Sequence, residues 1–176
     1  MKAVFKNRPK LKPISTKIDL ILEIAAFLFF LAIWLLPVLM FQSLPETIPT
    51  HYNLKGEIDD WGSKTTIFIL PAIGLVLFIG LTVLNKYPHI FNYPSEITEE
   101  NALQQYSMAT RWIRIIKLIV VLLFFAIEWQ ICNAAENSKL PVWFLPVAIV
   151  IPIVLPIILA FSLTKKSVKA KKTTMK

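Results

Sequence analysis

Residues 18–41 read IDLILEIAAFLFFLAIWLLPVLMF. A helix rises about 1.5 Å per residue, so this stretch is long enough to cross a hydrocarbon core about 30 Å thick. Three more apolar stretches of similar length follow, at 65–85, 112–132 and 141–163. Apolar residues make up 56% of the 176 residues and charged residues 17%, whereas about a quarter of a soluble domain is charged. The sequence therefore predicts an all-α integral membrane protein, a four-helix transmembrane bundle.

Lysine and arginine predict how the bundle is oriented. The tails at 1–17 and 164–176 hold six of these cations each. The segment 86–111 holds two more, and the two connections on the other side hold only Lys55, Lys64 and Lys139. Because cytoplasmic segments carry the excess of basic residues, both tails are predicted to be cytoplasmic. The four-span membrane domain then covers 18–163.

Two segments complicate this simple picture. Residues 95–108 precede the third stretch and favour a separate short helix at the membrane surface. The fourth stretch contains Pro141, Pro146, Pro152 and Pro156. Interior prolines remove helical hydrogen bonds, so this span is expected to be kinked.

The net charge of +8 comes from lysine and arginine residues that flank the apolar stretches, so contact with anionic lipid and the orientation of the spans explain it. Nucleic-acid binding is not expected, because no basic helix with interleaved aromatic residues and no binding motif is present. Cys132 is the only cysteine, which excludes an intrachain disulfide. The sequence contains no nucleophile elbow, phosphate-binding glycine loop or His-Glu-x-x-His string, so an enzyme is not the expected class.

Three ionisable residues are predicted to lie within the spans. Glu23 and Lys117 reach similar depths in the cytoplasmic half if spans one and three are parallel. Unpaired charge in hydrocarbon is costly, so the two are expected to pair, either as a structural link or as part of a proton or ion step. Glu128 is expected near the outer end of span three, either reaching toward water or contributing to a site with the loop above it.

The loop at 42–64 joins the first two spans on the exported side. Pro45 and Pro49 favour extended backbone before them, and residues 50–53 are predicted to form a short strand. Asn53 and Gly56 predict a reversing turn with a positive φ at the glycine. A small extracytoplasmic, hairpin-like cap on the bundle is the expected result, with Trp61 at the interface and Gly62 turning the chain into span two.

The loop also resembles a known family. The pattern is carried by Pro45, Ile48, Pro49, His51, Tyr52, Asn53, Gly56, Asp59, Trp61, Gly62 and Lys64. It is similar to domain of unknown function 1648, which forms the N-terminal part of SdpI-type toxin-immunity membrane proteins, and the likeness covers about 20–85. The resemblance implies a multi-pass protein of a bacterial plasma membrane, linked to protection against a secreted toxin or to signalling.

The candidate ligand-binding or structural residues of the cap are His51, Asn53, Gly56, Asp59, Trp61, Gly62 and Lys64. His51 and Asp59 are also weak candidates for a divalent metal such as zinc, together with Asp60 and Glu128. In the alternative interpretation no metal or cofactor binds: His51 hydrogen-bonds within the hairpin, and Lys64 pairs with Asp59 to hold it closed.

Three functions are compatible with this pattern. The first is an immunity-type protein or signal receptor whose cap binds an extracellular peptide toxin or a partner membrane protein. The second is a small transporter or a transporter's accessory subunit, with Glu23, Lys117 and Glu128 along its polar path and a homodimer supplying volume. A membrane-embedded enzyme ranks third, because no nucleophile and base can be named together.

Overall fold

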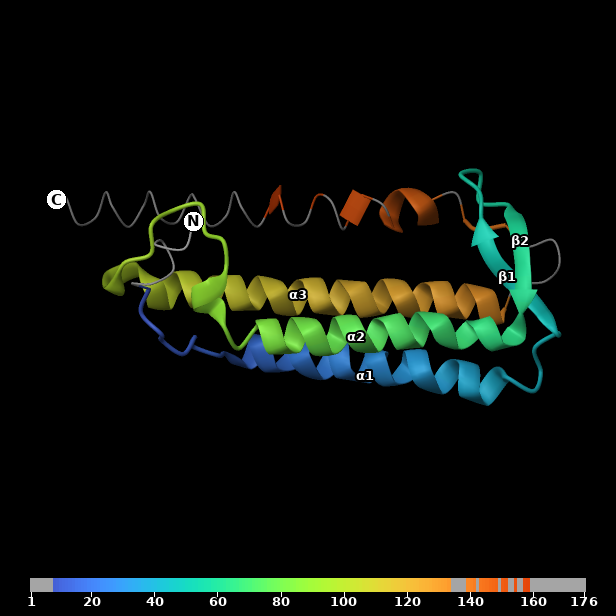
Figure 1. Ribbon diagram of the computed structural model, residues 1–176, viewed down its shortest axis with the longest axis horizontal. Helices are drawn as coiled ribbons and strands as arrows, with labels where there is room; N and C mark the ends of the chain where they lie inside the picture. The colour runs from blue at the N-terminus through green and yellow to red at the C-terminus, as the bar shows by residue number, and fades with distance from the viewer. Residues whose placement is uncertain are drawn as a thin grey trace.

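The computed structural model describes residues 8–133, 139–141, 143–148, 150–151, 154 and 157–158. Three long helices lie side by side, and a β-hairpin sits at one end of them (Figure 1). In chain order the elements are α1 (Lys17–Met40), β1 (Thr47–Tyr52), β2 (Ile58–Ser63), the 3₁₀ helix η1 (Lys64–Phe68), α2 (Ile69–Leu84), the 3₁₀ helix η2 (Pro88–Ile90) and α3 (Glu99–Cys132).

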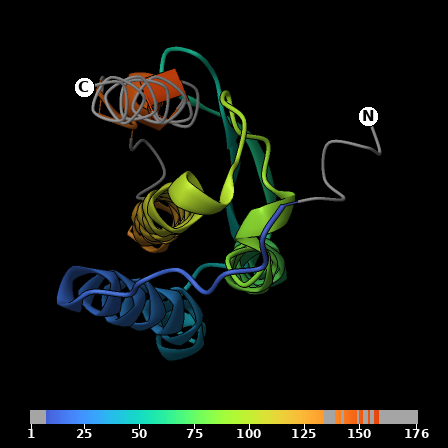
Figure 2. The same ribbon diagram turned by 90° about the vertical axis from the view of Figure 1, so that its left-hand side faces the viewer.

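The two ends of the bundle differ in what covers them. The strands β1 and β2 lie where α1 and α3 end, and we call this the hairpin end (Figure 1). The segment joining α2 to α3 lies at the opposite end, which we call the loop end. Figure 2 looks along the bundle from the loop end and shows α1, α2 and α3 grouped together, with the described residues between 143 and 158 beside α3.

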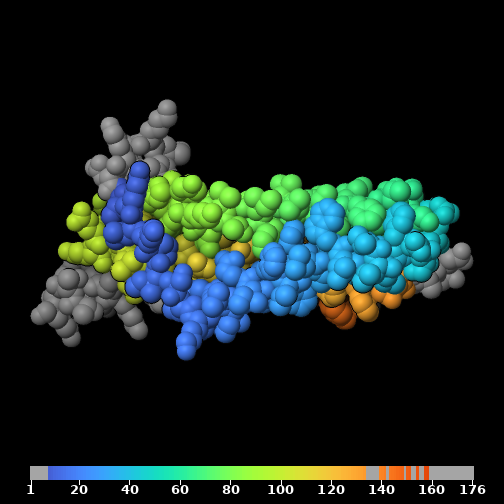
Figure 3. All heavy atoms as spheres, turned by 90° about the horizontal axis from the view of Figure 1, so that it is seen from below, coloured from blue at the N-terminus to red at the C-terminus, as the bar shows by residue number. Residues whose placement is uncertain are grey.

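The helices bury only a narrow stripe and expose the rest of their apolar surface. On α1 the buried positions are Asp19, Ala26, Ile33 and Pro37. Large apolar side chains such as Leu28, Leu35 and Val76 are more than half exposed. From below, the side chains of α1 and α2 form one continuous long face (Figure 3). Exposed apolar surface of this extent is stable only in lipid, and α1, η1 with α2, and α3 are each long and apolar enough to cross a membrane.

The first two predicted spans agree with these bounds to within a residue or so. The third predicted span, 112–132, lies within α3, but that helix begins at Glu99 and runs without a break through most of the segment 95–108 that was predicted as a separate surface helix. The fourth span stays a prediction: the described residues between 144 and 158 are helical, while most of the other residues of 141–163, residues 1–7 and the basic tail at 164–176 lie outside the described residues.

Polar side chains define where α1 and α3 begin. Asp19 Oδ2 accepts a hydrogen bond from the Thr16 backbone N–H at 2.8 Å. In α3 the Asn101 side chain accepts one from the Thr98 backbone N–H at 3.0 Å. Each bond satisfies a backbone donor that the helix itself cannot pair, so the chain turns into the helix at a fixed residue.

A two-stranded antiparallel sheet lies between α1 and α2, so the fold is not all-α; its first strand begins at Thr47, earlier than the predicted strand at 50–53. Strand β1 pairs with β2 from Thr47 opposite Ser63 to Tyr52 opposite Ile58, with irregular register around His51. The hairpin packs on the bundle through a buried cluster of Leu44, Ile48, Ile67 and Cys132. The chain after α3 also reaches the hairpin, because the Leu140 backbone N–H donates to the Gly56 carbonyl at 2.8 Å.

Replacing Gly56 with alanine is expected to destabilise the protein. Gly56 has a φ of 76°, and an added Cβ would lie 3.0 Å from the Leu140 carbonyl oxygen. The left-handed backbone alone costs other residues about 1–2 kcal/mol. Thermal unfolding in detergent micelles should show a lower Tm for Gly56→Ala.

Gly80→Ala is the matched control for that measurement. Gly80 lies inside α2 with open space around its missing Cβ. Alanine should therefore stabilise the helix by about 0.5–1 kcal/mol. If the Tm of Gly56→Ala were equal to or higher than the Tm of Gly80→Ala, the role assigned to Gly56 in this turn would be contradicted.

Candidate functional site

The tip of the hairpin is built around the Asn53 side chain. Its Oδ1 accepts hydrogen bonds from the backbone N–H groups of Lys55 at 2.8 Å and Glu57 at 3.1 Å. The backbone closes the same turn, since the Gly56 N–H donates to the Asn53 carbonyl at 2.9 Å. Asn53 and Gly56 are thus brought together as the sequence suggested, and both set the shape of the turn.

Ion pairs hold the hairpin to its surroundings. The Lys139 ammonium lies 2.7 Å from Glu57 Oε1, and this hydrogen bond, with that from Asn53, holds the pKa of the Glu57 carboxyl below its ordinary value. The Lys64 ammonium lies 3.0 Å from Glu46 Oε1 and above the Phe41 ring. The prediction that Lys64 pairs with Asp59 is therefore wrong. Lys64 pairs with Glu46 and so joins the two ends of the hairpin.

His51 and Asp59 contact each other across the strands. His51 Nδ1 lies 2.6 Å from Asp59 Oδ1, and both side chains are exposed to solvent. Within the described part of the chain, no three His, Cys, Asp or Glu side chains gather closely enough to hold a metal ion. Asp60 bonds the Trp61 backbone N–H instead, and Glu128 is fully buried beneath the hairpin, so these four residues are not brought together.

Two hollows flank the hairpin end of α3. One has a volume of about 520 Å³ and lies between the hairpin and the helix ends, lined among others by Ile48, Trp61, Gly62, Ile67 and Ile131. An added Cβ at Gly62 would approach the Thr50 methyl group to 2.7 Å, so the Thr50 side chain would have to shift.

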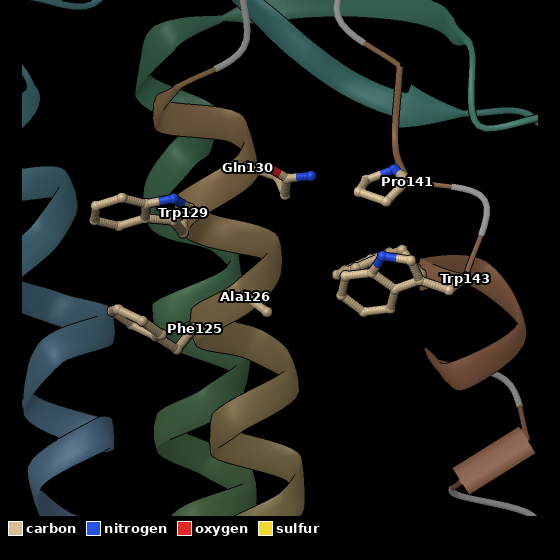
Figure 4. Close-up of a pocket in the computed structure, with 7 residues that line it drawn as sticks. Phe125, Ala126, Trp129, Gln130, Pro141 and Trp143 are labelled. Carbon is tan, nitrogen blue, oxygen red and sulfur yellow. The ribbon is translucent and has the colours of Figure 1, made fainter.

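The other hollow has a volume of about 430 Å³ and lies between α3 and the chain after it. Figure 4 shows Ala126 and Gln130 of α3 facing Pro141 and Trp143 across it. Trp129 lines its edge and turns toward α1, as Phe125 does, whose ring packs on Phe29. Both hollows are mainly apolar, with tryptophans that are about half exposed.

A second polar group lies toward the loop end, between α1 and α3. We call it the ion cluster; it consists of Asp19, Glu23, Arg111, Arg114 and Lys117. Lys117 is almost fully buried and bonds Glu23, and its ammonium also donates to Thr82 of α2 at 3.0 Å. The predicted pairing of Glu23 with Lys117 is present in the geometry, and it ties all three helices together at one depth.

The rest of the ion cluster was missed by sequence reasoning. Arg111 Nε donates to Asp19 Oδ1 at 2.9 Å, and Arg114 Nε lies 3.2 Å from Glu23 Oε1. The spacing of these residues could have predicted the ion cluster. Asp19 and Glu23 are four residues apart on one face of α1, and the three cations recur at every third residue of α3. Asp19, near the start of α1, is buried and paired with Arg111 rather than exposed to water.

Glu128 is the third ionisable residue expected within the spans. It is fully buried, and neither carboxylate oxygen has a hydrogen-bond partner among the described residues. Cys132 lies one turn further along α3, where it packs in the buried cluster with Leu44, Ile48 and Ile67 beneath the hairpin. The interpretation of Glu128 as reaching toward water does not fit this burial.

Comparison with known proteins gives a family and no function. A family model described as a domain of unknown function (DUF1648) matches residues 28–75, which run from α1 through the hairpin into α2. An uncharacterised protein of Archaeoglobus fulgidus is 32% identical over 126 residues, covering 64% of this chain and 69% of the relative. No solved structure matches the chain significantly.

A double-mutant cycle tests the buried pair. Glu23→Gln leaves Lys117 charged and nearly enclosed, so it should cost about 3 kcal/mol of unfolding free energy. Lys117→Met should cost less, because Arg114 still faces Glu23. The double variant should recover part of the loss, since the uncompensated charge is gone.

Lys86→Met provides the control, because this lysine is exposed at the loop end. Its effect should stay within about 0.5 kcal/mol. Thermal or denaturant unfolding in micelles measures all four variants. Strictly additive losses in the double variant would show that Glu23 and Lys117 do not stabilise each other.

Proposed function

The chain belongs to the DUF1648 family of membrane proteins, and from this premise we propose that it is an immunity-type receptor whose hairpin binds an extracellular peptide. The observation that carries the proposal is the hollow of about 520 Å³ shared by the hairpin and the outer ends of α2 and α3. A ligand seated there contacts the hairpin and the bundle together, so its binding acts on both.

The proposed orientation puts the hairpin end outside the plasma membrane. The described basic residues at the loop end include Lys10, Lys12, Lys17 and Lys86, whereas the hairpin end holds Lys55, Lys64 and Lys139. This asymmetry supports a cytoplasmic loop end and cytoplasmic termini. A bacterial source is implied by the family resemblance and belongs to the proposal; the matched relative is archaeal.

The lining of the hollow indicates the chemistry of the ligand. Apolar side chains dominate it, with Trp61 at 42% exposure on the hairpin side and Asp60 among the lining residues. Partly exposed tryptophan in a pocket is typical of the residues that contribute most to a protein interface. An apolar segment carrying a positive charge, as in many membrane-active peptides, fits these groups.

The exposed His51–Asp59 pair has a supporting role in this proposal. It links the two strands beside the hollow's Thr50 and Asp60. Lys64 and Glu46 do the same at the base of the hairpin. These pairs keep the strands in register, which fixes where Trp61 lies relative to α2 and α3.

Transport, alone or as an accessory subunit, is the second candidate, favoured by the buried Glu23–Lys117 pair and by Glu128. Ala26, Ile33 and Val121 form a tight apolar cluster with several phenylalanine rings between these two polar levels. A polar path along α3 is therefore interrupted in this conformation. A homodimer that would widen such a path stays a prediction.

Cell survival under toxin challenge tests the receptor proposal. Sensitive bacteria producing the protein are exposed to a panel of secreted membrane-active peptides and compared with cells lacking it. Protection against at least one peptide is expected, and Trp61→Ala should reduce it by more than about tenfold, since losing a central aromatic contact costs about 2 kcal/mol or more.

Leu54→Ala is the matched control, because Leu54 is 90% exposed at the hairpin tip and does not line the hollow. It should protect as well as the unaltered chain at equal abundance in the membrane. Survival that is the same with and without the protein, for every peptide in the panel, would refute the proposal.

A further inference from the structure

Another hollow lies at the loop end, apart from the two that flank the hairpin end of α3. It has a volume of about 450 Å³. Ile14 and Thr16 of the N-terminal segment form one wall, and the first turns of α3 form the other. Helical spacing of three or four residues places the α3 lining on one face of that helix. These lining residues are Glu100, Leu103, Gln104, Ser107, Met108 and Arg111.

Hydrogen bonds fix the N-terminal segment that forms one wall of this hollow. The Arg8 guanidinium donates to the carbonyls of His89 and Phe91 at 3.2 and 2.6 Å. Further along the segment, the Ile14 backbone N–H donates to Ser107 Oγ of α3 at 2.9 Å. Because the segment is bonded at both places, the wall is part of the folded protein and the hollow has a defined shape.

Arg111 brings positive charge and a remaining hydrogen-bond donor to the hollow. Its Nε and Nη2 donate to the Asp19 carboxylate at 2.9 and 3.0 Å, and Nη2 also donates to Thr16 Oγ1 at 3.1 Å. Nη1 has no acceptor among the described residues, and the side chain is 37% exposed. The ion cluster sets three cations against two carboxylates. The excess positive charge and the remaining donor favour an anionic ligand.

The hollow lies at the level of the lipid headgroups. Helix α1 begins at Lys17, directly after Thr16, and its apolar stretch follows. Helix α3 has 34 residues, or about 50 Å, so its first turns extend beyond a hydrocarbon core of about 30 Å. Ile14 is 58% exposed and lines the hollow together with Leu103 and Met108. Apolar and cationic groups side by side at this depth match a lipid better than a free anion.

We propose that this hollow binds the headgroup of one anionic phospholipid. A phosphate oxygen accepts from Arg111 Nη1, and the first acyl carbons lie against Ile14, Leu103 and Met108. Exposed Lys10, Lys12 and Lys17 of the adjoining segment attract the lipid, because basic residues beside a membrane favour anionic headgroups. The Glu100 carboxylate also lines the hollow and opposes this attraction. The lipid site is independent of the peptide-binding proposal.

Lipid titration of the purified full-length protein in neutral-detergent micelles tests the site. Phosphatidylglycerol or phosphatidylcholine is added, and native mass spectrometry counts the bound lipid. Phosphatidylglycerol should bind at the lower concentration, and it should raise the Tm because it binds the folded state. Equal affinity for the two lipids would overturn the proposal. An equal rise in Tm with inorganic phosphate instead of lipid would overturn it too, since the ligand would then be a free anion.

Two exposed side chains of the hollow allow matched changes of charge. Gln104→Glu adds a carboxylate to the hollow and should weaken phosphatidylglycerol binding about fivefold. Glu100→Gln removes a carboxylate and should strengthen binding by a similar factor.

Asn92→Asp and Glu99→Gln are the matched controls. They make the same two charge changes on exposed residues at the loop end that do not line the hollow, so their effects should be smaller. If each control changed the affinity as much as its partner variant, net charge rather than the hollow would attract the lipid, and the proposal would be overturned. An affinity that neither Gln104→Glu nor Glu100→Gln changes would also overturn it.

Discussion

Charge must be paired before it can lie in hydrocarbon, and the packing of α1 against α3 depends on this requirement. The ion cluster places two acids of α1 against three cations of α3, and Lys117 extends the contact to Thr82 of α2. Long apolar helices have little reason to select one rotation or one register in lipid, because lipid tails are as apolar as their own side chains. The ion cluster supplies that selection at the loop end, and it thereby fixes what faces inward at the hairpin end. Glu128, Pro37 and Pro71 are buried in the centre as a consequence.

The hairpin is the other fixed part of the structure. Its turn is set by Asn53 and Gly56, its strands are joined by His51 with Asp59 and by Lys64 with Glu46, and Leu140 and Lys139 hold its tip from the far side of α3. The segment shared with the DUF1648 family thus supplies the second half of α1, the hairpin and the start of α2. The hollow of about 520 Å³ lies where this segment meets α3, so a ligand there contacts both halves of the molecule.

Much of this fold was predictable because a helix that crosses hydrocarbon needs a long apolar stretch, which is visible in the sequence. The lengths of the first two stretches predicted their helices almost to the residue. Pro45, Pro49, Asn53 and Gly56 predicted the hairpin. The start of α3 was not predictable from apolar length, since its first three turns are polar and pack on Tyr93 and Ile97 outside the apolar stretch. The Glu23–Lys117 pair was predicted because both residues lie at similar depths in their spans. The partners of Lys64 and Asp59 depend on the register of the two strands, and a shift of one residue moves every side chain to the other face of the sheet. The burial of Glu128, Pro37 and Pro71 depends on the rotation of each helix, which periodicity does not predict when nearly every position is apolar.

Chemical labelling of single cysteines tests most directly whether the bundle crosses the membrane with its hairpin outside. Cys132→Ser removes the only native thiol, and Leu54→Cys and Ile90→Cys then place one exposed thiol at the hairpin tip and one in the loop between α2 and α3. In intact cells a membrane-impermeant maleimide should label Leu54→Cys and leave Ile90→Cys unmodified until the membrane is permeabilised. Equal labelling of both positions in intact cells, or labelling of Ile90→Cys alone, would contradict the account.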